Sequence, residues 1–238
     1  MCTVTFIPLK EGFILTASRD EKIFRPTLKP MLYKQLGNTI VYPKDELAGG
    51  TWIAMSSNKQ IACLLNGGFE NHKKELAYKK SRGTILLESF NFSSHGDFLK
   101  NLNLNGIEPF TLLLLNYQDG LQFKELVWDG KLKHIHDLNT SIPKIWSSVT
   151  LYSEENRKLR TKWFENWLGK RSEEAGFDVL KFHLGNHSSD SENDILMKRE
   201  NDLQTLSISQ FRLDNQGTYF LYHDLKDGKN DKIDLNRL

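Results

Sequence analysis

The first 21 residues decide the fold, and they read MCTVTFIPLKEGFILTASRDE. Two apolar segments rich in β-forming residues, Val4–Ile7 and Phe13–Ala17, flank the turn-forming stretch Pro8–Gly12. This pattern predicts an N-terminal β-hairpin, with Cys2 at an edge or end of its sheet. A hairpin returns its second strand beside the first, so the charged segment Ser18–Glu21 that follows it is expected to lie near the start of the chain.

Cys2 stands directly after the initiator methionine. Methionine removal is efficient before a small side chain, and it leaves a thiol and a free α-amine on one residue. The α-amine has a pKa of about 8, close to that of a thiol, so it can act as base for its own nucleophile. Asp20 would orient this amine, and Arg19 would lower the thiol pKa or hold a substrate carbonyl or carboxylate. The alternative is that Cys2 is a small apolar residue that opens a strand and that Ser18–Glu21 is a charged turn.

The composition indicates one domain or a small pair of domains. The chain has 238 residues, of which 39% are hydrophobic, enough for a sizeable core. Its 32 basic and 30 acidic side chains give a net charge of +2, which argues against a dedicated nucleic-acid surface and against attraction to membranes by charge alone. We interpret the one basic run, Lys73–Arg82, as a solvated segment.

Cysteine usage and apolar runs indicate the compartment. Cys2 and Cys63 are the only cysteines, so no disulfide framework is expected and a reducing cytosol is the natural location. Lys10 and Glu11 interrupt the first apolar stretch too early for a signal peptide. The longest apolar run, Phe110–Leu115, is far too short to cross a bilayer. The sequence therefore predicts a cytoplasmic protein without an integral membrane segment.

Predicted strands joined by hairpins dominate the rest of the chain. They are expected at Thr51–Met55, Gln60–Leu65, Phe110–Asn116, Gln122–Trp128, Lys131–His136, Val149–Tyr152, Thr205–Leu213 and Thr218–Tyr222. A few helices are expected, at Ile85–Phe90 and after the N-cap residues Ser94 and Ser153. Leu28–Leu36 is punctuated by Pro and Lys and is expected to be irregular. The pattern predicts an α+β protein with antiparallel sheets, and no clean linker divides residues 1–238.

Short motifs follow one another through the first 90 residues. They are Met1-Cys2-Thr3, Phe13-Ile14-Leu15-Thr16, Ser18-Arg19-Asp20-Glu21, Gly49-Gly50-Thr51-Trp52-Ile53, Ala62-Cys63-Leu64-Leu65-Asn66 and Ser81-Arg82-Gly83. In this order they resemble the NRDE family, also called the transport and Golgi organisation family, which is named after an Asn-Arg-Asp-Glu motif. Ser18 stands where the family pattern has Asn. Beyond residue 90 the resemblance is looser, and its best point is the strand at Thr205–Ser209.

The resemblance implies an N-terminal-nucleophile hydrolase-like fold, a four-layer αββα sandwich of two antiparallel sheets formed by a single domain. In cysteine members of that wider fold, such as bile-salt hydrolases and penicillin V acylases, an N-terminal Cys attacks an amide. Carried over by motif, Cys2 would be the nucleophile, Asp20 would bind its amine and Arg19 would tune the thiol. Asn66 would contribute to the oxyanion hole. Substrate contacts are expected from Ser18, Glu21, Trp52 and Arg82.

Two functions of different classes follow from this resemblance. The first is a cysteine amidohydrolase that acts on a non-peptide C–N bond of a small molecule and needs no cofactor. The alternative is a non-catalytic protein on the same fold that binds and transports haem, lipid or acyl-CoA. His134 and His136 alternate on a predicted strand beside Asp137, but no third ligand follows at a diagnostic spacing, so no metal site is predicted there.

Overall fold

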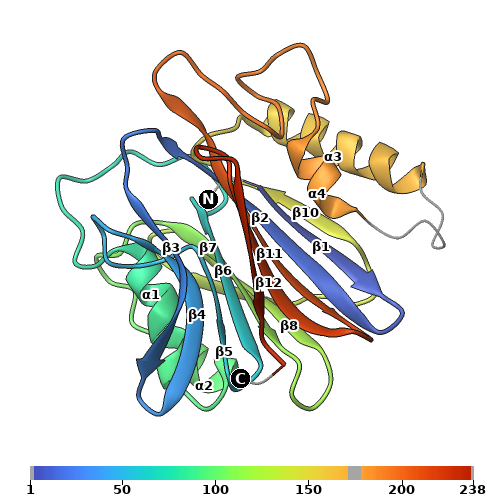
Figure 1. Cartoon of the computed structure of the whole chain (residues 1–238). Coiled ribbons are helices and arrows are strands. Elements are labelled where there is room, and N and C mark those ends of the chain that lie inside the picture. Colours follow the sequence, from blue (N-terminus) through green and yellow to red (C-terminus); the bar gives the residue numbers. More distant parts are fainter. Residues whose placement is uncertain (1–2, 171–177, 237–238) are drawn as a thin grey trace. The chain divides into compact units, whose positions relative to one another are not determined.

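A computed structural model of the chain describes residues 3–170 and 178–236. Contacts divide the chain into two compact units, one formed by Met1–Phe24 with Ser141–Arg237 and the other centred on Arg25–Thr140. Each unit is built on one antiparallel sheet with helices packed against it (Figure 1). The predicted α+β class with two antiparallel sheets is therefore confirmed. The assignment of residues 1–238 to a single domain stays a prediction.

The first unit contains a six-stranded sheet in the order β10-β1-β2-β11-β12-β13. Its strands are β1 (Thr3–Leu9), β2 (Gly12–Lys22), β10 (Lys144–Ser147), β11 (Leu203–Asp214), β12 (Gly217–Asp224) and β13 (Lys229–Asp234). All neighbouring strands run antiparallel. The described part of this unit also contains two helices, α3 (Glu154–Gly169) and α4 (Val179–Leu184), which lie beside β1 and β10 in Figure 1.

The N-terminal hairpin forms as predicted, but its second strand is longer than expected. β2 continues through Ser18–Glu21 to Lys22, and it lies between β1 and β11. The alternative interpretation of Ser18–Glu21 as a charged turn is therefore wrong, because the segment belongs to an interior strand. Buried charged side chains in an interior strand need specific partners, since desolvation of an unpaired charge is costly.

The longest helix, α3, begins where its capping signal predicts. The Ser153 hydroxyl accepts a hydrogen bond from the Asn156 N–H at 3.2 Å, and Glu154 and Glu155 occupy the first turn, where negative charge stabilises the helix dipole. Phe164 packs in a cluster with Ile7, Ile14, Val179, Phe182 and Ile195. This cluster joins α3 and α4 to the β1–β2 hairpin. None of the helices in the described part of the chain is long and apolar enough to span a membrane.

The second unit contains a seven-stranded sheet in the order β3-β4-β5-β6-β7-β8-β9. Its strands are β3 (Thr27–Gln35), β4 (Asn38–Asp45), β5 (Ile53–Ser56), β6 (Gln60–Asn66), β7 (Phe110–Asn116), β8 (Gln122–Trp128) and β9 (Lys133–Asp137). The helices are α1 (Arg82–Glu88), the 3-10 helix η1 (Ser89–Asn91) and α2 (His95–Asn101). They cover the core that centres on Ala62, Leu64, Leu112 and Leu114.

Two local predictions differ from the structure, and β4, β13 and α4 form where no regular element was expected. Leu28–Leu36 is not irregular but forms the edge strand β3, because a bulge between Leu28 and Met31 accommodates Pro30. The strand expected at Val149–Tyr152 is instead a turn, and β10 precedes it at Lys144–Ser147. β13 was not expected at all, because its alternation is almost entirely between polar residues.

Candidate active site

The proposed nucleophile Cys2 lies outside the described residues. The described chain begins at Thr3, which follows Cys2 by one peptide bond and pairs with Ser18 of β2. Thr3 is fully buried. The start of β1 is therefore in register with the Ser18–Glu21 motif, as the predicted hairpin requires.

The side chains of this motif alternate between the two faces of the sheet. Successive residues of a strand point in opposite directions, so Ser18 and Asp20 share one face while Arg19 shares the other with Ala17. The first three of the four motif residues are buried, with Arg19 4% and Asp20 3% exposed. The roles expected for Arg19 and Asp20 therefore start from opposite faces of β2.

The carboxylate of Asp20 is held by two hydroxyl donors from distant parts of the chain. Tyr152 Oη donates to Oδ2 at 2.7 Å, and Thr205 Oγ1 donates to Oδ1 at 2.7 Å. A register shift in β11 between Thr205 and Ser207 places Thr205 directly opposite Asp20. Hydrogen bonds to a charged acceptor are stronger than neutral ones, so this pair fixes the orientation of the carboxylate.

Tyr152 links Asp20 to a fully buried cation. The Arg160 guanidinium lies 3.8 Å from the centre of the Tyr152 ring, a cation–π contact. Arg160 also donates to the carbonyl oxygens of Asn193 and Asp194, at 2.8 and 2.6 Å, and to the Thr3 hydroxyl. One arginine on α3 thus fixes the first described residue of β1 and the ring whose hydroxyl holds Asp20.

His183 of α4 is another buried polar side chain that packs against this face of the sheet. Its Nδ1 lies 2.7 Å from Ser18 Oγ, and its Nε2 lies 2.8 Å from Thr5 Oγ1. Complete burial, followed by the nearby positive charge of Arg160, lowers the pKa of His183 to about 3. His183 is therefore neutral at physiological pH, and each ring nitrogen has a hydroxyl partner that locks β1, β2 and α4 together.

Sequence reasoning missed Tyr152, Arg160, His183 and Thr205 as parts of this site. The pattern around Tyr152 predicts a strand, and Thr205 stands in a predicted strand with no further signal in the sequence. The sequence does contain one signal for Arg160. It precedes Trp163 by three residues and Phe164 by four, a spacing that places it on the apolar face of α3. A charged residue on such a face indicates a buried partner.

In the second unit, the expected oxyanion residue Asn66 ends β6 at a tightly held turn. Asn66 pairs with Phe110 of β7, and the following Gly67 adopts a φ of 91°, which favours glycine. The Gly67 N–H donates to the Pro109 carbonyl at 3.1 Å, and its carbonyl accepts from Thr111 Oγ1 at 3.1 Å. Both backbone groups of Gly67 are therefore fixed directly after Asn66.

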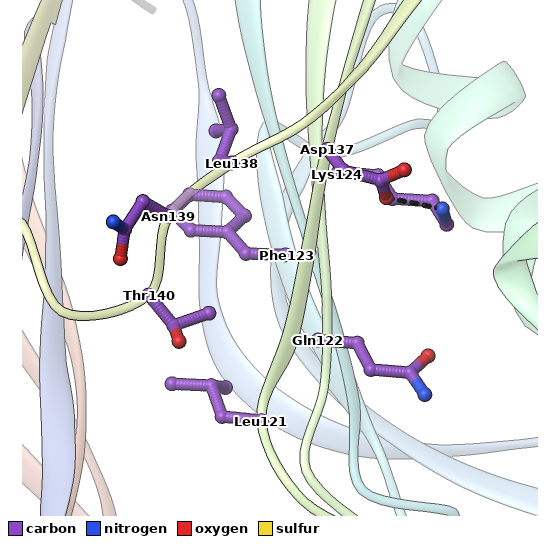
Figure 2. Close-up of a pocket in the computed structure, with 8 residues that line it drawn as sticks. All are labelled: Leu121, Gln122, Phe123, Lys124, Asp137, Leu138, Asn139 and Thr140. Atoms are coloured by element: carbon purple, nitrogen blue, oxygen red, sulfur yellow. Dashed lines mark hydrogen bonds and ion pairs between the residues drawn. The ribbon is translucent and has the colours of Figure 1, made fainter.

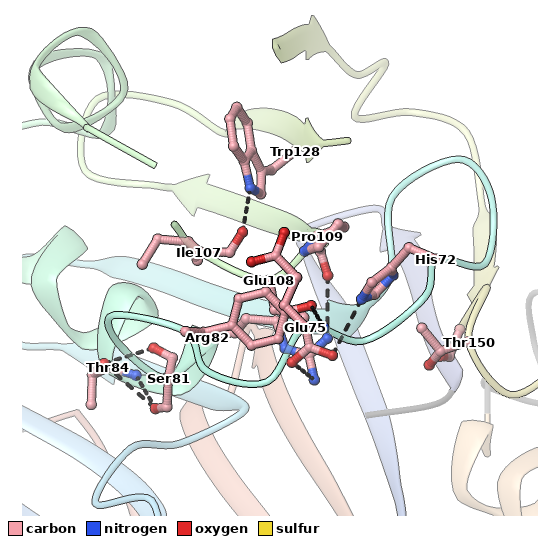
Figure 3. Close-up of polar contacts among 12 residues, drawn as sticks. His72, Glu75, Ser81, Arg82, Thr84, Ile107, Glu108, Pro109, Trp128 and Thr150 are labelled. Carbon is pink, nitrogen blue, oxygen red and sulfur yellow. Dashed lines mark hydrogen bonds and ion pairs between the residues drawn. The ribbon is translucent and has the colours of Figure 1, made fainter. Parts of the chain in front are cut away.

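Arg82, expected to contact substrate, binds the same backbone segment (Figure 3). Its guanidinium forms an ion pair with Glu108 Oε2 at 3.0 Å and donates to the Pro109 carbonyl at 3.2 Å. The other carboxylate oxygen of Glu108 lies 3.3 Å from His72 Nε2. The Pro109 carbonyl thus receives hydrogen bonds from both Arg82 and Gly67, so the structure connects Arg82 to the turn after Asn66.

Two of the sequence motifs meet backbone to backbone. A Cβ placed on Gly50 would lie 2.5 Å from the carbonyl carbon of Gly83, and a Cβ on Gly83 would lie 2.6 Å from the Thr51 carbonyl oxygen. Only glycine fits at either position. Trp52, which follows in the first motif, is 4% exposed. Glu21 lies half-buried on β2, and its Oε1 accepts the Lys22 N–H at 2.9 Å.

A surface pocket of about 460 Å³ lies elsewhere in the second unit (Figure 2). It is lined by residues 121–124 at the start of β8 and by residues 137–140 at and after the end of β9, and two of these residues, Lys124 and Asp137, form an ion pair. Among the described residues that are expected to act on substrate, none lines this pocket.

The second cysteine does not offer a competing nucleophile. Cys63 is fully buried in β6, and burial raises the pKa of its thiol to about 12. A thiol with so high a pKa carries almost no thiolate at physiological pH. Chemistry by a cysteine of this chain therefore depends on Cys2.

Solved structures of three hydrolytic enzymes resemble the whole chain or most of it. A variant of conjugated bile acid hydrolase from Clostridium perfringens has a TM-score of 0.62 at 11% identity, covering 100% of this chain and 93% of that one. Penicillin V acylase from Agrobacterium tumefaciens has a TM-score of 0.59 at 12% identity, with 100% and 87% covered. An orthologue of N-acylethanolamine-hydrolyzing acid amidase from Caenorhabditis elegans has a TM-score of 0.55 at 11% identity, with 88% and 92% covered.

These likenesses show that the chain has the fold of N-terminal-nucleophile hydrolases, as predicted. No curated protein sequence is significantly similar to it. The family described as Transport and Golgi organisation 2 (TANGO2) matches residues 1–217, which is most of the chain and includes every motif on which the resemblance rested. The chain belongs to the Transport and Golgi organisation 2 family.

Proposed function

We propose that this protein is a cysteine amidohydrolase that cleaves a non-peptide C–N bond of a small molecule, with Cys2 as nucleophile and its own α-amine as base. The observation that carries the proposal is the held carboxylate of Asp20. It is 3% exposed, and it lies on the strand that pairs with β1, which begins one residue after Cys2. Acidic side chains are rarely buried unless they are paired or hydrogen-bonded.

Asp20 has the properties that a partner for an N-terminal ammonium needs. Its two oxygens are oriented by Tyr152 and Thr205, so a cation could be held without first rearranging the carboxylate. Arg160 fixes Thr3 through its hydroxyl, which restrains the chain directly after Cys2. The fold likeness to a hydrolase, an acylase and an amidase supports the same reaction class.

In the proposed reaction, the Cys2 α-amine takes the thiol proton as the sulfur attacks the carbonyl carbon of the amide. Asp20 stabilises the resulting ammonium, Arg19 favours the thiolate, and the Asn66 amide donates to the oxyanion. The C–N bond then breaks, and the ammonium returns the proton to the departing amine. Water, deprotonated by the α-amine, hydrolyses the thioester and releases the carboxylic acid with the free thiol. Substrate contacts from Ser18, Glu21, Trp52 and Arg82 stay predictions.

The test is hydrolysis of a panel of N-acyl amino acids, N-acylethanolamines and N-acyl anilides by the purified protein. We expect amine release from at least one class, and loss of that release in Cys2→Ala and Asp20→Asn. Cys63→Ala is the matched control, because its buried thiol should contribute nothing to turnover. Turnover that survives in Cys2→Ala would show that another group performs the chemistry.

The same samples separate hydrolysis from the carrier function expected as an alternative. A carrier would bind haem or acyl-CoA saturably while releasing no amine from any substrate. Binding that depends on Cys2 without turnover would replace the amidohydrolase proposal by the carrier proposal.

A further inference from the structure

The segment that joins β6 to α1, residues 67–81, carries a dense basic sequence. It contains Lys73, Lys74, Lys79 and Lys80 but only two acidic residues, Glu70 and Glu75. It has no regular secondary structure over residues 71–80. The net charge of the whole chain is only +2, so a considerable part of its positive excess is concentrated here.

Two contacts hold the base of this segment and leave the part between them projecting from the unit. His72 Nε2 lies 3.3 Å from Glu108, and the Lys79 N–H donates to the Gly106 carbonyl at 2.9 Å. Within the projecting part, the Glu75 N–H donates to Tyr78 Oη at 3.0 Å. We call residues 73–80 the basic tip. Its ends are fixed on the polypeptide before β7, so the tip is presented in a defined place.

The side chain at the middle of the basic tip is fully exposed and aliphatic. Leu76 has a relative exposure of 108%, the largest value among the exposed large hydrophobic residues, and Ala77 beside it is also exposed. Exposing a leucine to water costs about 2 kcal/mol relative to burying it. Leu76 therefore gains from contact with an apolar phase.

The lysines of the basic tip flank Leu76 on both sides in the sequence. Lys80 forms an ion pair with Glu88 at 2.6 Å. In the described part of the chain, Lys73, Lys74 and Lys79 have no ion-pair partner within 4.0 Å, and Glu75 is the one acidic residue of the tip. Long lysine side chains can place their charges at a polar surface while an apolar neighbour between them inserts more deeply.

We propose that the basic tip docks on the surface of an anionic phospholipid bilayer, with Leu76 inserted at the headgroup level and Lys73, Lys74 and Lys79 bound to the phosphates. An anionic bilayer supplies negative charge and an apolar phase in one surface, which matches an exposed leucine between lysines. A nucleic acid would satisfy the lysines but would offer no apolar environment to Leu76. This docking is independent of the proposed hydrolysis, because it involves no turnover.

Flotation with extruded vesicles of phosphatidylcholine, with and without phosphatidylserine, tests the proposal on the full chain. We expect binding to the anionic vesicles only, and weaker binding as salt is raised. Each lysine near such a surface strengthens binding about fivefold. The double variant that carries Lys73→Glu and Lys74→Glu should therefore bind anionic vesicles more than tenfold more weakly than the parent. Leu76→Ser should weaken it by about tenfold.

Matched controls exist elsewhere in the chain. Leu47 is 72% exposed but follows Asp45 and Glu46, so Leu47→Ser should leave vesicle binding unchanged. Lys226→Glu with Lys229→Glu makes the same charge change at the β12–β13 turn and tests whether total charge alone is responsible. Leu76, Lys73 and Lys74 are exposed, so the variants should keep the circular dichroism spectrum and melting temperature of the parent.

Three results would overturn the proposal. The first is absence of binding to anionic vesicles even at low salt. The second is an equal loss of binding in the tip variants and in the control variants. The third is a pair of observations: the protein binds a DNA duplex with the same dependence on the tip lysines, and Leu76→Ser leaves vesicle binding intact. Together these would show that the basic tip binds polyanions in general.

Discussion

Tyr152→Phe should destabilise the protein by about 2 kcal/mol, because it removes one hydroxyl from a buried carboxylate. Tyr152 Oη donates to Asp20 at 2.7 Å, and both residues are nearly inaccessible to solvent, so water cannot replace the lost donor. Hydrogen bonds to charged groups contribute about 1.5–3 kcal/mol. The phenyl ring keeps its stacking on Arg160, so the change isolates the hydroxyl.

Thermal unfolding followed by circular dichroism measures this effect. For a chain of this size, 2 kcal/mol corresponds to a decrease in melting temperature of about 4–8 °C. Tyr219→Phe is the control: its hydroxyl donates to the Gln216 carbonyl at 2.7 Å in an exposed place, and its loss should cost less than about 0.5 kcal/mol. Equal melting temperatures for the two variants would refute the idea that Tyr152 holds Asp20.

Three further predictions follow from buried groups. Gly50→Ala should lower the free energy of unfolding in urea by more than about 2 kcal/mol, because its Cβ would lie 2.5 Å from the Gly83 backbone. Gly169→Ala is the control: its Cβ meets nothing within 4 Å, so it should be neutral or mildly stabilising. Similar urea midpoints for the two variants would contradict this close packing. Burial lowers the pKa of His183 in the folded protein from its ordinary value of 6.5 to about 3. Between these two pH values only the unfolded chain binds a proton at this residue, so the stability of the fold decreases as the pH falls from 6.5 to 3. His183 alone should account for a loss of about 2 kcal/mol at pH 5. His183→Asn should therefore show a shallower decrease in stability, while His95, with a pKa of about 4, still contributes. A slope unchanged from that of the parent protein would show that His183 is charged when folded. Cys63 has a thiol pKa of about 12, so it should resist iodoacetamide in the folded protein and react only after denaturation. Mass spectrometry of its tryptic peptide measures this modification. Rapid modification of the folded protein would mean that β6 opens readily.

Much of the fold could be predicted because its signals are local. The first hairpin, the β5–β6 hairpin and the caps at Ser94 and Ser153 follow from apolar alternation, turn residues and side chains that bond within three positions. Gly67 has a positive φ and Gly50 lies against the backbone of Gly83, two local conditions that a glycine in the sequence can indicate. β3 was missed because Pro30 argues against a strand unless a bulge accommodates it.

The candidate site could be predicted only in part because its contacts are long-range. Asp20 was singled out from its motif, but its partners Tyr152 and Thr205 lie 132 and 185 residues away. Ser18 and His183 are separated by 165 residues. Single-sequence patterns do not report such pairs. The charges of Ser18–Glu21 leave a charged turn open as an alternative, and they give no sign of the burial that those partners make possible.

The most direct test of the central claim is mass spectrometry of the protein quenched during turnover of an N-acyl substrate. The proposal that Cys2 is an N-terminal nucleophile predicts a mature chain that lacks Met1 and carries the acyl group on the peptide that begins with Cys2. A chain that retains Met1, or an acyl group found on any other peptide, would contradict it.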